Sequence, residues 1–242
     1  MSSGNAGSAG SERSAGSDSR WNARMIGILF IVASVTAIIG GSLAALPLDE
    51  PDYLVALADQ EAQVVTGVLL LALQTIAVIG IAVLFFPVLK REHEGLALGY
   101  VGTRVVEGVL VLIGALSILA LLTVSQDYGQ SGADGAEPAG AGLAATYDWS
   151  YLLGPMLFFS VSALILYPLL LRSRVVPAWL SVWGLLGGLL LLGRTVVEMY
   201  GTDLSGAAQA LLTAPIGVNE MVLAVWLIIR GFGTVPSHRT PA

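Results

Sequence analysis

The sequence predicts an all-α polytopic membrane protein, a bundle of six transmembrane helices with its N- and C-termini in the cytoplasm. Of its 242 residues, 55% are hydrophobic and only 12% are charged, whereas a soluble domain has about 25% charged residues. The apolar residues gather in six runs, each close to or above the roughly 20 residues that cross a hydrocarbon core. The basic residues outside these runs can all be placed on one side of the membrane.

The expected spans lie within a membrane domain of residues 21–231, and they cover residues 25–46, 62–89, 96–124, 149–171, 178–200 and 210–230. Residues 1–20 are rich in Gly, Ser and Ala without apolar periodicity, so we expect a disordered cytoplasmic tail there. Residues 232–242 form a second cytoplasmic tail. A signal peptide cleaved near residues 42–44 is the alternative for the first run, which is longer than a typical apolar region of 7 to 15 residues.

Loops and turns connect the expected spans. We expect a short acidic loop over residues 47–61, tight turns over 90–95 and 172–177, a flexible exposed loop over 125–148 and a short loop over 201–209. Pro155 lies about one turn into the fourth apolar run, where it either kinks the helix or marks its first turn.

The distribution of Lys and Arg predicts the orientation. With six spans and the N-terminus inside, the three outer loops contain no Lys or Arg, and only Arg104 and Arg194 lie within spans. All the others fall on the inner side: Arg13, Arg20, Arg24, Lys90, Arg91, Arg172, Arg174, Arg230 and Arg239. This bias follows the positive-inside rule and indicates a multi-pass protein of the cell membrane.

The third span carries two charges, Arg104 and Glu107. A charge near the bilayer centre costs about 2.5 to 3.5 kcal/mol on insertion scales, so such residues face the protein interior and find partners. Residues three apart share a helix face. Thr103, Gly108, Val111 and Ala115 lie on the same side, and these small side chains let another helix approach closely. We therefore expect this face to pack inward.

The sixth span carries Asn219 and Glu220. At 1.5 Å per residue, Glu220 lies roughly 15 Å from the inner boundary, Glu107 roughly 16 Å and Arg104 roughly 12 Å. One arginine and two carboxylates at matched depth predict a buried polar site of Arg104, Glu107, Glu220 and Asn219 with one excess negative charge, unless a proton or cation joins it.

A secondary pair lies on the fifth span, where Arg194 and Glu198 are four residues apart and nearer the outer surface. Arg194 either reaches inward to balance the carboxylates or snorkels outward with Glu198. All of these charges have a purely structural alternative, because buried ion pairs often only fix the register of helices.

Several kinds of chemistry have no residues to support them. The chain has no Cys, and its two His residues, His93 and His238, lie outside the apolar runs, so we expect no metal site and no cofactor. No motif of a hydrolase, metalloprotease or phosphate-binding loop is present, so we expect no catalytic residues, although an intramembrane enzyme is left open. The expected partners are the lipid bilayer and a small molecule, ion or proton, without nucleic acid. The oligomeric state does not follow from the sequence.

Three segments together resemble a prokaryotic integral-membrane family, the domain of unknown function 4386. They are residues 104–107 (RVVE), residues 171–180 (LRSRVVPAWL) and residues 220–231 (EMVLAVWLIIRG). The resemblance covers residues 24–231, and this chain differs in having Ala178 where the family often has a basic residue. The family implies six membrane helices and supplies no established activity.

These observations favour a small transporter or a proton- or ion-coupled carrier with its site at Arg104, Glu107 and Glu220. The alternative is a structural or regulatory membrane subunit in which the same charges only lock the packing of the helices.

Overall fold

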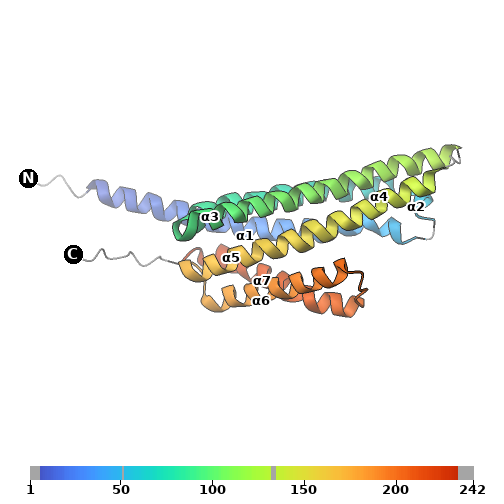
Figure 1. Ribbon diagram of the computed structural model, residues 1–242. Helices are drawn as coiled ribbons and strands as arrows, with labels where there is room; N and C mark the ends of the chain where they lie inside the picture. The colour runs from blue at the N-terminus through green and yellow to red at the C-terminus, as the bar shows by residue number, and fades with distance from the viewer. Residues whose placement is uncertain (1–5, 51, 132–134, 234–242) are drawn as a thin grey trace, which may run out of the picture.

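The computed structural model describes residues 6–50, 52–131 and 135–233, and these residues confirm the all-helical prediction (Figure 1). The elements in order are α1 (Ala6–Ala45), the 3-10 helix η1 (Leu46–Asp49), α2 (Tyr53–Asp59), α3 (Glu61–Ser131), α4 (Ala136–Tyr151), the π-helix η2 (Leu152–Phe158), α5 (Phe159–Ser173), α6 (Ala178–Met199) and α7 (Gly206–Arg230). No strand occurs among the described residues.

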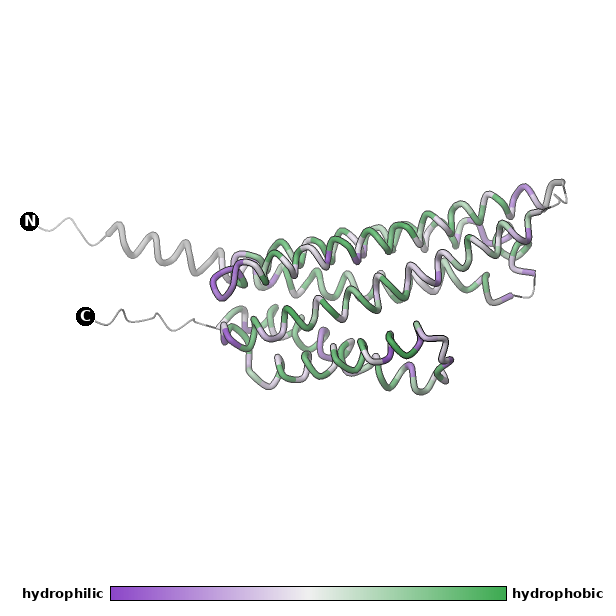
Figure 2. The backbone as a smooth tube through the Cα atoms, in the orientation of Figure 1, coloured by the Kyte–Doolittle hydropathy of each residue, from purple (hydrophilic) through white to green (hydrophobic). Residues whose placement is uncertain are grey.

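Five helical segments of the described chain are long and apolar enough to cross a membrane: Ser19–Leu48, Glu61–Tyr128, Ala136–Ser173, Ala178–Met199 and Gly206–Arg230. In Figure 2 the hydrophobic colour follows these segments, and polar colour gathers at their ends. This is the pattern of a multi-pass membrane protein in contact with a lipid bilayer.

The second of these segments folds back on itself. His93 has non-helical backbone angles (φ −164°, ψ 105°), which divide α3 into two arms over residues 61–92 and 94–131. The His93 ring accepts a hydrogen bond from the Leu96 backbone N–H at 3.1 Å, and this caps the start of the second arm. A Cβ added at Gly108 would lie 2.9 Å from Thr75 Cγ2, so the two arms pack side by side (Figure 1). The turn predicted over residues 90–95 is therefore confirmed.

Close contacts at glycine hold α1 against its neighbours. A Cβ at Gly27 would lie 2.5 Å from the carbonyl oxygen of Ala224 on α7. A Cβ at Gly40 would lie 2.9 Å from the carbonyl oxygen of Gly67 on α3. In lipid, helices gain no hydrophobic free energy by associating, because no water is displaced from between them. Their association therefore depends on close van der Waals packing, which small residues allow. The first and last helices of the bundle are thus direct neighbours.

The two long loops expected between the spans are wrong in large part. Residues 47–61 contain η1 and α2, and within residues 125–148 α3 continues to Ser131 and α4 begins at Ala136. These elements form a second apolar core at the end of α1, including Ala44, Leu57 and Ile118. The Ser125 hydroxyl donates a hydrogen bond to the Leu54 carbonyl oxygen. Alanine favours helix, and this local core supplies the packing that stabilises these short apolar pieces.

Two further expectations need correction. α1 begins at Ala6, so residues 6–20 are helical and not a disordered tail, because extending an existing helix is less costly than nucleating one. α7 begins at Gly206, four residues before the expected start of the sixth span. Residues 1–5 and the expected tail over 234–242 lie outside the described residues. Pro155 lies inside the π-helical turn η2, where the missing N–H of proline interrupts the regular helical bonding, so its role is a local irregularity within a continuous helix.

Candidate functional site

Arg104 is the centre of the predicted polar site. It lies on the second arm of α3 and is only 2% exposed, although it is charged. Its Nη1 donates hydrogen bonds to both carboxylate oxygens of Glu107, at 3.2 and 3.0 Å. Both side chains are 3% exposed, so the pair is isolated from the outer face of the bundle. The face predicted to pack inward does so, since Gly108, Val111 and Ala115 are buried too.

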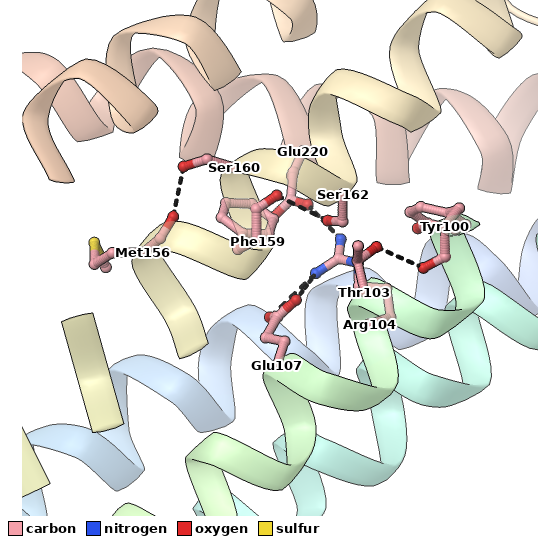
Figure 3. A network of polar contacts seen from close by, with 9 residues as sticks. All are labelled: Tyr100, Thr103, Arg104, Glu107, Met156, Phe159, Ser160, Ser162 and Glu220. Atoms are coloured by element: carbon pink, nitrogen blue, oxygen red, sulfur yellow. Dashed lines mark hydrogen bonds and ion pairs between the residues drawn. The ribbon is translucent and has the colours of Figure 1, made fainter. Parts of the chain in front are cut away.

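The second carboxylate comes from α7. Arg104 Nη2 donates to Glu220 Oε1 at 3.4 Å, so one guanidinium bridges two helices (Figure 3). In Figure 3 the two glutamates approach the guanidinium from opposite sides. The side chain of Glu220 keeps 13% exposure, compared with 3% for Glu107. The structure therefore brings Arg104, Glu107 and Glu220 together, and Glu220 is the more accessible of the two carboxylates.

Aromatic rings complete the surroundings of Arg104. Its guanidinium carbon lies 4.8 Å from the ring centre of Phe159 on α5 and 5.7 Å from that of Tyr100. A ring face within about 6 Å attracts a cation. Neither ring belongs to the site predicted from the sequence, although Tyr100 lies one helical turn before Arg104 and that spacing could have indicated the contact. Nothing in the sequence pairs Phe159 with Arg104.

Asn219 does not belong to the cluster. Its Nδ2 donates to the carbonyl oxygen of Leu180 on α6 at 2.9 Å, and the residue is fully buried. Neighbouring residues on a helix point in directions about 100° apart, so Asn219 and Glu220 face different helices. Asn219 joins α7 to α6, whereas Glu220 joins α7 to α3.

A cavity of about 880 Å³ lies beside the cluster. Its walls come from α1, both arms of α3, α4, η2, the start of α5 and α7, and Arg104, Glu107 and Glu220 all line it. Most of the remaining lining is apolar, and Gln74, which is 7% exposed, adds an amide group to the hydroxyl groups of the other polar lining residues. A pocket of this size with convergent polar groups is typical of small-molecule sites, whose volumes run from about 300 to 1,000 Å³.

The secondary pair lies at a smaller pocket nearer the α6–α7 connection. Arg194 Nε donates to Glu198 Oε1 at 3.1 Å, its Nη2 donates to Gln209 Oε1 at 3.4 Å, and its Nη1 donates to the hydroxyl of Thr213. Arg194 and Glu198 line a pocket of about 490 Å³. Of the two predicted alternatives, Arg194 pairs with Glu198 and does not join the central carboxylates.

The charges of the central cluster do not balance. One arginine meets two carboxylates, and among the described residues no other Lys, Arg or His forms an ion pair with them. No group of three or more Asp, Glu or His side chains that could hold a metal ion occurs within the described ranges. The cluster thus has one more acidic than basic group, which suits a proton or a single positive charge.

Comparison with protein families gives a match over residues 25–231, to the family described as domain of unknown function (DUF4386). The chain belongs to this family. The match runs from the apolar part of α1 to Gly231, directly after α7. It therefore includes α3 and α7, which carry Arg104, Glu107 and Glu220. Searches of curated proteins and of solved structures find no match.

Proposed function

We propose that this DUF4386 protein is a small membrane carrier whose substrate binds beside Arg104, Glu107 and Glu220 and moves together with a proton or another cation. The observation that carries the proposal is the excess carboxylate at a buried cluster that lines a large cavity. A structural lock needs only matched charges. Glu220 shares Arg104 with Glu107 and stays partly exposed, so its carboxylate is the group to which a moving positive charge can bind.

The proposed topology has six crossings in the cell membrane, with both termini cytoplasmic. It is supported by the turn at His93, which lets each arm of α3 cross separately, and by the basic residues at one end of the bundle. The chain has no Cys, so single cysteines can be labelled without background. We expect Thr202→Cys to react with a membrane-impermeant maleimide in intact cells and Glu94→Cys to react only after permeabilisation. The reverse pattern would overturn the orientation.

Transport can be tested in proteoliposomes with an imposed pH gradient, by recording currents while small organic cations are added. We expect current with the parent protein, none with Glu220→Gln and a strongly reduced current with Glu107→Gln. Glu198→Gln is the matched control, because it removes a carboxylate at the secondary pocket and leaves the central cluster intact. Equal currents from the parent protein and Glu220→Gln, with both proteins folded, would exclude the carrier mechanism.

The second candidate is a structural or regulatory subunit. The observation in its favour is that Arg104 binds carboxylates from α3 and α7 at the same time. In that case Arg104→Ala abolishes the folded protein, and exchanging the two charges (Arg104→Glu with Glu220→Arg) restores it. A charge-exchanged protein that folds but carries no current would show that the cluster does more than hold the helices.

A further inference from the structure

We infer that the cavity beside the Arg104 cluster binds a monovalent organic cation with an apolar body, which reaches it sideways from the bilayer between α1 and α7. This inference rests on the proposed function and names its substrate class. Three features of the cavity support it, namely its charge, its apolar walls and its opening.

The charge of the cluster favours a cation over an anion. Both Nη atoms of Arg104 are already engaged, at 3.0 Å from Glu107 and 3.4 Å from Glu220. Its ring contacts with Phe159 and Tyr100 occupy the two neighbouring aromatic faces. Arg104 Nε is buried without a hydrogen-bond partner, but an anionic ligand that reached it would lie beside two carboxylates of like charge. A cation, by contrast, can approach Glu220, which is the partly exposed member and lines the cavity.

The walls of the cavity favour an apolar body. Beyond the charged cluster, the surface that faces the cavity includes Leu71, Val78, Leu110 and Met156. A small hydrated ion would leave most of about 880 Å³ lined by apolar groups without a partner. A ligand with one charge and several hydrocarbon groups fills this shape and places its charge at Glu220.

The opening of the cavity lies between α1 and α7. The two helices touch at Gly27 and Ala224. Farther along, both line the cavity, and a Cβ added at Gly41 or at Gly217 would meet nothing within 4 Å. The cavity-lining residues Ile38 and Val218 are 70% and 50% exposed on the flanks of these helices. In a membrane such apolar exposed residues face lipid, so this side of the cavity opens toward the bilayer and not only toward water.

The glycines supply a variant that fills the cavity and leaves the charges untouched. Gly217→Leu puts an isobutyl group into the open space at the α7 wall, without a backbone contact to overcome and with better helix propensity. Gly193→Leu is the matched control, because Gly193 lies on α6, also has nothing within 4 Å and does not line the cavity. Both proteins should therefore fold like the parent.

The test is equilibrium binding to the full-length protein in lipid nanodiscs, with empty nanodiscs subtracted. The probe is radiolabelled tetraphenylphosphonium, and its companion is tetraphenylborate, which has the same shape and the opposite charge. We expect saturable binding of the phosphonium only. Gly217→Leu and Glu220→Gln should each weaken it by tenfold or more, which corresponds to about 1.4 kcal/mol, and Gly193→Leu should leave it unchanged.

Each outcome decides between alternatives. Equal binding of both probes, or unchanged phosphonium binding in Gly217→Leu, overturns the inference. Phosphonium-selective binding without any current in the proteoliposomes retains the binding site and removes the carrier function. Proton current without phosphonium binding retains the carrier and limits its cargo to protons or small ions, which also overturns the inference. Phosphonium binding by Glu220→Gln is compared with that of the parent protein only if the two proteins have the same thermal unfolding. Gly217→Leu tests the binding site independently, because it leaves the charges unchanged.

Discussion

The replacement Arg104→Gln is the most direct probe of the energetics of the cluster. It keeps a polar side chain of similar reach but removes the charge that both Glu107 and Glu220 contact. Removing one partner of a buried ion pair costs about 3 to 5 kcal/mol, because the remaining charge is left buried without compensation. Glu107, at 3% exposure, has little access to water, so this full range applies to it. For a protein of this size the loss lowers Tm by roughly 6 to 20 °C.

The assay is thermal unfolding of the purified protein in detergent, followed by intrinsic tryptophan fluorescence. A second variant separates charge from packing. Replacing Arg104, Glu107 and Glu220 together by Met removes every buried charge of the cluster, and exchanges of this kind are often neutral or stabilising. We expect the triple variant to recover most of the lost Tm while losing cation binding. A decrease below about 4 °C for Arg104→Gln alone would refute the view that Arg104 compensates these two carboxylates.

Three other changes have expected results that the same unfolding assay checks. Gly27→Leu should prevent α1 from packing on α7 and cost about 3 kcal/mol or more, since even a Cβ there would lie 2.5 Å from a backbone oxygen. Gly102→Leu is the control and should be tolerated, because nothing lies within 4 Å of a Cβ at that position. Equal Tm values for the two variants would contradict the packing of α1 on α7. Asn219→Leu should cost about 1 kcal/mol, the worth of an interhelical hydrogen bond in a membrane, and leave cation binding unchanged; loss of binding would return Asn219 to the site. Arg194→Gln should lower stability by about 1.5 to 3 kcal/mol, because it removes the charge that Glu198 and two side chains of α7 contact and the pair with Glu198 is only 10% and 14% exposed; an unchanged Tm would show that these contacts do not join α6 to α7.

The ion pair between Arg104 and Glu220 could be expected from the sequence, because the depth of each charge in the membrane follows from its position within its span. A span begins at a known boundary and rises 1.5 Å per residue, so two charges at equal depth on inward faces can find each other. The contact between Glu107 and Arg104 could be expected from their spacing alone, because residues three apart share a helix face. The neighbouring Asn219 was included through its adjacency in sequence, although the same helical geometry turns it toward Leu180.

The rest depended on contacts between distant segments. Phe159 approaches Arg104 from another helix at 4.8 Å, and no periodicity relates the two positions. Residues 125–131 are mostly polar and residues 136–148 are rich in alanine and glycine, and both compositions are compatible with loop as well as helix. Their stability comes from the second core around Leu57 and Ile118, which exists only once α2 packs against α3. The cavity likewise depends on the place where α1 and α7 diverge. The sequence of one helix does not indicate where a second helix leaves it.

The position of Glu107 on the same helix as Arg104 has a consequence for how the protein is made. The α3 hairpin can enter the membrane with its arginine already neutralised by its own carboxylate, at the 3.0 Å contact described above. Glu220 lies on α7, the last helix of the described chain to be synthesised. When α7 inserts, Arg104 is already present on α3 to pair with Glu220. Because α7 also closes against α1, the cavity wall and the excess negative charge are completed in the same step of assembly. The protein therefore holds no unpaired intramembrane charge until the whole bundle is in place to contain it.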